Sequence, residues 1–173
     1  MSFDRWHDVL EKVSQFTNKI GMPMDEGIVE AVAIMQFIGF HTTMSCEGHV
    51  GRHTGGPYIM FMSPVAEKLR KQAAALDSRS SLQYKTLYRK AMRANITEQQ
   101  KIYHLLDTFY KNRHTPFSQR LIIHTMGFSA FRLECQGSNI TYMLSRPQQK
   151  TLLENNRAEL QTFAQYVRTV YQF

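Results

Sequence analysis

Residues 45–56 place a cysteine, two histidines and an arginine in a glycine-rich stretch between two β-prone runs. The runs cover residues 40–45 and 58–62, and segments with helical periodicity lie on both sides of them. Glycine allows the backbone to turn sharply at such a place. Two short strands are expected to follow one another directly, joined by this loop, with helices before and after them. This order argues against a fold in which strands and helices alternate regularly.

Apolar residues at three- and four-residue steps predict several helices, with breaks at glycine, proline and serine-rich positions. Asp25 is expected to cap the second helix, and Asn95 is expected to restart a helix after a break. The expected helices cover residues 3–19, the stretch between the Asp25 cap and the break at Gly39, and residues 65–77, 81–94 and 95–113, followed by one from beyond Pro147 to the end of the chain.

Further strands are expected at residues 121–124 and 128–135, with a weaker one at 140–144. Strands scattered among helices predict an α+β fold, in which a small, mostly antiparallel sheet packs against several helices. A length of 173 residues suits one domain over residues 1–173. The pattern leaves open whether His124 or Cys135 approaches the loop.

Composition narrows the class of protein. No apolar run is long enough to span a membrane. Acidic residues occur near the start of the sequence, where a signal peptide would have its apolar segment. We therefore expect a cytoplasmic protein without a membrane partner. Two cysteines, Cys46 and Cys135, are too few for a disulfide scaffold and are expected to be free thiols. The sequence does not indicate an oligomeric state.

The net charge of +7 is concentrated in residues 64–93, which contain eight basic and two acidic residues and so carry a charge of +6. Lys85, Arg89 and Arg93 recur at four-residue steps beside Tyr84 and Tyr88. Such a stripe can bind a nucleic-acid backbone while the tyrosines stack on bases. A solvated helix face explains the same pattern without a partner.

The loop suits three kinds of chemistry, of which metal binding and thiol catalysis are the first two. Cys46, His49 and His53 offer one thiolate and two imidazoles, a donor set that zinc accepts. Alternatively, Cys46 acts as a nucleophile, with Glu47 and His49 as its catalytic partners.

The third possibility is a binding site for an anionic small molecule, a nucleotide or a nucleic-acid element. Arg52 and His49 would contact the anion, and the amides of the loop would orient it. The predicted ligand-binding residues also include Ser45, Gly48, His53 and Tyr58. The stretch follows neither common phosphate-loop pattern. A tight structural loop around a buried cysteine is the alternative without a ligand.

Residues 43–49, Thr-Met-Ser-Cys-Glu-Gly-His, and the run Ile-Met-Phe-Met-Ser at 59–63 carry a family resemblance. Together they resemble the Ser-x-Ser-Cys-Ser-Gly-Arg loop and following strand of the wybutosine-synthesis tRNA methyltransferases. That resemblance implies S-adenosylmethionine as cofactor and a tRNA base as substrate. The form Ser-Cys-Glu-Gly-His is also similar to a segment of small uncharacterised bacterial proteins.

These observations favour binding of an anionic ligand at residues 45–56, with enzymatic activity left open. One alternative is an RNA-modifying transferase, and another is a non-catalytic module that binds nucleic acid or protein through the basic helices. Zinc and S-adenosylmethionine are the cofactors that these hypotheses involve.

Overall fold

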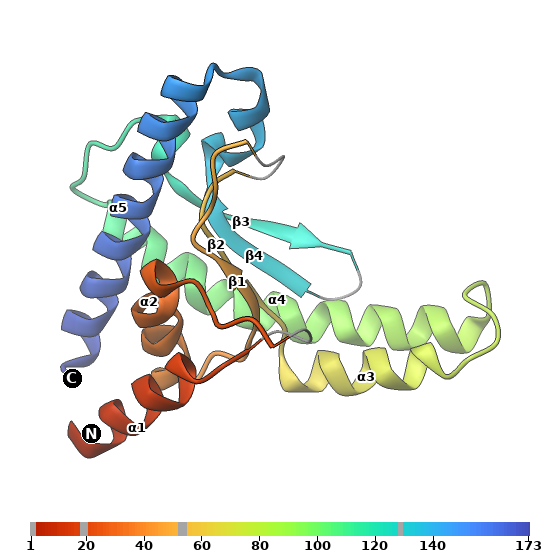
Figure 1. The fold of residues 1–173 in the computed structure, drawn as a ribbon. Helices are drawn as coiled ribbons and strands as arrows, with labels where there is room; N and C mark the ends of the chain where they lie inside the picture. Colours follow the sequence, from red (N-terminus) through yellow and green to blue (C-terminus); the bar gives the residue numbers. More distant parts are fainter. Residues whose placement is uncertain (1–2, 18–20, 52–54, 128–129) are drawn as a thin grey trace.

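A four-stranded antiparallel sheet in the order β1-β2-β4-β3 lies among the helices of a computed structural model (Figure 1). The structure describes residues 3–17, 21–51, 55–127 and 130–173. The combination of an antiparallel sheet with several helices confirms the predicted α+β fold. The strands are β1 (Thr42–Cys46), β2 (Tyr58–Phe61), β3 (Leu121–Met126) and β4 (Ala130–Cys135). The helices are α1 (Phe3–Ser14), α2 (Glu26–Phe37), α3 (Pro64–Ala74), α4 (Leu82–Tyr110) and α5 (Arg146–Tyr171), with 3₁₀ segments η1 (Phe117–Gln119) and η2 (Gln136–Met143).

One face of the sheet forms the main core with the helices. Alternate residues of β2, β3 and β4 project to this face, because successive side chains of a strand point to opposite sides. They pack with apolar side chains of α1, α2, α4 and α5. The rings of Phe61 and Phe131 stack across neighbouring strands at 5.3 Å between centroids, and both are almost fully buried.

Helix α4 runs without a break where the sequence predicts two helices, so the expected restart at Asn95 is wrong. The Asn95 side chain is buried, and its Oδ1 accepts a hydrogen bond of 2.8 Å from the backbone amide of Ser63. The Asn95 side chain therefore links the middle of α4 to the start of α3 by a hydrogen bond. Ser81 caps α4 instead, since its hydroxyl accepts from the amide of Tyr84.

Two further expectations are corrected. The first helix ends at Ser14, not at residue 19, and Thr17 forms an isolated bridge with Pro23. The weak strand at 140–144 is wrong, because 3₁₀ turns extend to Met143. There the Thr141 hydroxyl donates to the carbonyl of Ser138, a local bond that favours turns over a strand ladder.

Other boundaries follow the expected pattern more closely. Strands β1 and β2 flank the loop as predicted, and β3 and residues 130–135 of β4 form the second hairpin. Residues 128–129, which the prediction included, lie outside the described residues. None of the helices in the described part of the chain is both long enough and apolar enough to cross a membrane.

We expect Phe131→Ala to lower the free energy of unfolding by about 3–5 kcal/mol, because it leaves a cavity between the sheet and the helices. Phe117→Ala is the control, since this ring is 72% exposed and its loss should cost no more than about 0.5 kcal/mol. Urea denaturation monitored by circular dichroism measures both. Equal midpoints for the two variants would contradict the packing described here.

Candidate functional site

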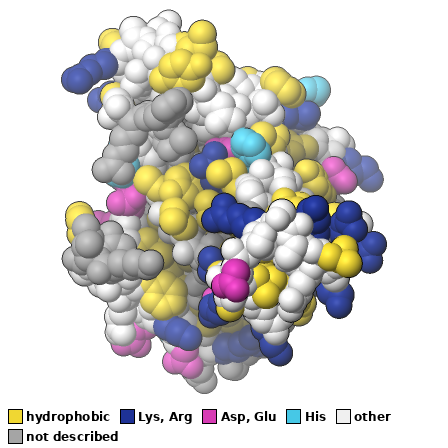
Figure 2. All heavy atoms as spheres, turned by 90° about the vertical axis from the view of Figure 1, so that its right-hand side faces the viewer, with side chains coloured by type: hydrophobic (Ala, Val, Ile, Leu, Met, Phe, Trp, Pro, Cys, Tyr) yellow, Lys and Arg dark blue, Asp and Glu magenta, His cyan; other side chains and the backbone are white. Residues whose placement is uncertain are grey.

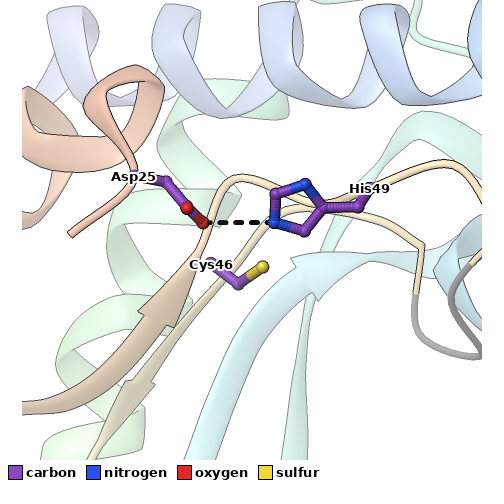
Figure 3. A group of neighbouring side chains, drawn as sticks. All are labelled: Asp25, Cys46 and His49. Atoms are coloured by element: carbon purple, nitrogen blue, oxygen red, sulfur yellow. Dashed lines mark ion pairs between the residues drawn. The ribbon is translucent and has the colours of Figure 1, made fainter. Parts of the chain in front are cut away.

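Asp25, Cys46 and His49 converge at the end of β1 (Figure 3). One ligand atom from each residue lies within 4.8 Å of the others. The His49 Nε2 atom is 3.5 Å from Asp25 Oδ2. All three residues are half-buried, so the group is partly shielded from solvent and still accessible from outside.

Asp25 belongs to this group because its side chain does not cap α2. It occupies the expected N-cap position, yet its carboxylate makes no hydrogen bond to the helix amides. Its Oδ2 instead accepts the backbone amide of Glu47 at 3.1 Å. This bond crosses from the start of α2 to the end of β1 and turns the carboxylate towards His49.

Cys46 and His49 are brought together by the turn at Gly48. Gly48 has a φ of +82°, which side chains rarely tolerate, and a Cβ there would lie 2.7 Å from Leu153 Cδ1 of α5. The Gly48 amide donates to Cys46 Sγ at 3.4 Å. The same turn carries the chain back so that the His49 ring lies over the cysteine.

Arg157 of α5 holds this turn from the other side. Its guanidinium donates to the carbonyls of Glu47 and Gly48 and to Glu47 Oε1, each at 2.8 Å. The other Glu47 oxygen accepts the amide of Gly27 at 3.1 Å. Both oxygens of Glu47, predicted to be catalytic, are therefore engaged in joining α2, the loop and α5.

The far end of the loop packs against η2 and α5. The Gly51 amide donates to Gln149 Oε1 at 2.9 Å, and Gly56 fits closely against Ser138 and Asn156. Ser138 and Asn156 are fully buried. The Ser138 hydroxyl and both polar atoms of the Asn156 amide have no hydrogen-bond partner among the residues that the structure describes.

Tyr58 and Ser45, two other predicted site residues, lie beside this group on the sheet. Tyr58 is opposite Cys46 in the β1–β2 pair, and its ring lies 5.0 Å from the Arg132 guanidinium. Ser45 precedes Cys46 on the strand and so projects to the opposite face. Arg52 and His53 lie outside the described residues, and the ligand role predicted for each stays a prediction.

His124 and Cys135 do not join the group. His124 Nδ1 lies 3.0 Å from Glu134 Oε1, which also accepts from Arg132 at 2.9 Å. This buried carboxylate lies opposite Tyr58 in the sheet. Cys135 follows it on β4 and faces the helices, where its thiol donates to the carbonyl of Asn156 at 3.8 Å.

Two of the site's important residues escape sequence reasoning. Asp25 precedes Cys46 by a whole helix, and Arg157 lies 110 residues after Glu47. The only local signal at Asp25 is its helix-cap position, and Arg157 falls on an ordinary amphipathic helix. No spacing rule connects either residue with the loop.

Comparisons with known proteins add no assignment, since no protein-family model, curated protein or solved structure matches this chain. The resemblance to the wybutosine-synthesis methyltransferases therefore stays a prediction. Any function proposed for the site rests on the geometry of Asp25, Cys46 and His49.

We expect the two thiols to differ in reactivity. Burial raises the pKa of Cys135 to about 12, so this thiol stays protonated at neutral pH, whereas Cys46 is half-exposed. Since the thiolate is the reactive form, iodoacetamide at pH 8 should modify Cys46 first and Cys135 only after unfolding. Peptide mass spectrometry measures both. Equal modification of the two cysteines in the folded protein would refute this.

Arg157→Ala should lower the free energy of unfolding by about 1–3 kcal/mol, because hydrogen bonds from a charged group are lost while Glu47 keeps its charge. The Arg157 side chain is 37% exposed, which places the effect towards the lower end of that range. Arg146→Ala, at the exposed start of the same helix, is the control for removal of a charge. Denaturation midpoints that move equally would show that Arg157 does not anchor the loop.

Proposed function

We propose that this protein binds a zinc-class divalent metal ion through Asp25, Cys46 and His49, and that the bound ion receives an anionic ligand or a water molecule. The observation that carries the proposal is the approach of three ligand atoms within 4.8 Å of one another. In a tetrahedral zinc site with bonds of about 2.0–2.3 Å, ligand atoms are about 3.3–3.8 Å apart. The separation of 3.5 Å between Asp25 and His49 already falls in this range.

The donor set indicates the kind of metal. A thiolate, an imidazole and a carboxylate suit zinc and related transition metals, whereas magnesium and calcium prefer oxygen donors alone. Asp25 and Cys46 together would neutralise the two charges of the ion. The amide of Glu47 orients the Asp25 carboxylate, which is the outer-shell support that metal ligands commonly have.

The arrangement fits a metal site better than a cysteine nucleophile activated by a histidine relay. In such a relay the imidazole directs one nitrogen to the thiol and the other to the carboxylate. Here Nε2 faces Asp25, while Nδ1 lies on the side of the ring away from Cys46 (Figure 3). A metal ion would lie at the point that both the His49 Nε2 atom and the Cys46 thiol face.

Three described protein ligands leave room for a further one at a tetrahedral ion, which is the arrangement of zinc sites that bind water or substrate. This supports the hypothesis of an anionic ligand at residues 45–56. Several loop amides are already used within the protein, those of Glu47, Gly48 and Gly51. The ion itself would therefore supply the attraction for the anion.

A second observation supports a ligand at this loop. The Ser138 hydroxyl and the Asn156 amide are buried next to Gly56 without hydrogen-bond partners among the described residues. Buried polar atoms of this kind are normally satisfied by water or by a bound molecule. They offer donors and acceptors for the polar part of a ligand that reaches the base of the loop.

The test is the metal content of protein expressed without a histidine tag and supplemented with zinc. Wild type should contain close to one zinc per chain, and Asp25→Asn, Cys46→Ser and His49→Ala should each lose most of it. Binding should weaken as the pH falls, because protons compete with a metal ion for thiolate and imidazole ligands. His53→Ala tests the ligand that the sequence pattern predicts but that lies outside the described residues.

His104→Ala is the matched control, because His104 is exposed on α4, which contributes no residue to the group. Circular dichroism verifies that each variant is folded. Folded wild type without metal after supplementation would overturn the proposal. So would three variants that retain as much zinc as the control.

A further inference from the structure

The α3–α4 hairpin extends from the body of the molecule to the right in Figure 1. Its two helices pack mainly on each other, with Ala66, Ala73 and Ala91 buried between or beneath them. Small side chains at a helix contact let the helices approach closely. The long polar side chains of both helices consequently occupy the outer surface of the hairpin.

In residues 64–93, which form α3, the turn and the first part of α4, most cations have no acidic partner within the described part of the chain. Lys71 pairs with Glu67 at 2.9 Å. The remaining basic residues are exposed and have no ion pair with any carboxylate in the described ranges: Lys68, Arg70, Arg79, Lys85, Arg89, Lys90 and Arg93. Outside residues 64–93, six of the eleven described cations are paired with acids: Lys101 at the inner end of α4, Arg113, Arg132, Lys150, Arg157 and Arg168.

This difference matters because exposed like charges repel one another, and two helices side by side bring them closer together. Lys85, Arg89 and Arg93 project at intervals of about 6 Å along α4, given a rise of about 1.5 Å per residue. When the molecule is seen from the free end of the hairpin, dark blue Lys and Arg side chains gather on this side (Figure 2). A polyanion with regularly spaced charges would relieve the repulsion.

We propose that the outer surface of the α3–α4 hairpin binds nucleic acid through its phosphates, without reading sequence. Nucleic acid fits this surface because each phosphate contact releases condensed counterions, and a line of contacts adds these gains together. The exposed cations extend along both helices, which matches an extended polyanion. This surface is separate from the Asp25–Cys46–His49 group, so the inference does not depend on the proposed metal site.

The experiment is fluorescence anisotropy of the full chain with a labelled single-stranded RNA and a labelled duplex DNA of mixed sequence. We expect binding at 50 mM salt that weakens at 200 mM by roughly a thousandfold or more for the duplex and by at least several hundredfold for the single strand, as for six or more phosphate contacts. The variant Lys85→Glu/Arg89→Glu/Arg93→Glu should bind at least tenfold more weakly at 50 mM salt. The slope of log K against log salt should fall by about 2–3.

The control variant Lys12→Glu/Lys111→Glu/Arg146→Glu changes the net charge equally at exposed positions outside residues 64–93. It should retain most of the affinity. Equal losses in the two triple variants would overturn the proposed surface, because net charge alone would then explain binding. Preference between the RNA and the DNA identifies which of the two supplies the phosphates.

Absence of nucleic-acid binding at 50 mM salt would also overturn the proposal, as would binding only to vesicles that contain phosphatidylserine. The variant Cys46→Ser separates the two proposals. It should keep full nucleic-acid affinity whether or not it has lost zinc, and the hairpin variant should keep its zinc. Circular dichroism of every variant establishes that the fold is retained.

Discussion

The guanidinium of Arg157 joins the last helix to the loop that carries Cys46 and His49, and the geometry of the site depends on it. Two hydrogen bonds from this group go to the backbone carbonyls of Glu47 and Gly48, and a third goes to the carboxylate of Glu47. Glu47 then bonds to Gly27, and its amide bonds to Asp25. The start of α2, the end of β1 and the middle of α5 are therefore held in one hydrogen-bonded network beside the candidate ligands.

The molecule separates its two candidate activities in space and in chemistry. Around the loop, charges are balanced within the protein, since Arg157 faces Glu47 and His49 faces Asp25. Along residues 64–93 of the α3–α4 hairpin the cations face solvent, and within the described part of the chain Lys71 is the only one of these eight with an acidic partner. A balanced, half-buried cluster suits a small ion and its ligand, whereas an unbalanced projecting surface suits a large polyanion.

Local patterns in the sequence predict much of this fold but only part of the site. Helix α2 and the strands around the loop follow from apolar periodicity and glycine positions, and Cys46 and His49 stand out as donors in one short segment. Asp25 and Arg157 could not be found, because their roles arise from contacts between distant elements. Asn95 misled the prediction for the same reason: its side chain bonds to α3, so it does not interrupt α4.

X-ray absorption spectroscopy at the zinc edge of the metal-loaded protein is the decisive measurement for the proposed metal site, because it reports which atoms surround the ion. We predict one sulfur at about 2.3 Å together with nitrogen and oxygen at about 2.0–2.2 Å. The zinc that Cys46→Ser still retains should have no sulfur neighbour, although this variant keeps Cys135. A zinc shell made only of nitrogen and oxygen in the wild-type protein would show that Cys46 does not hold the ion.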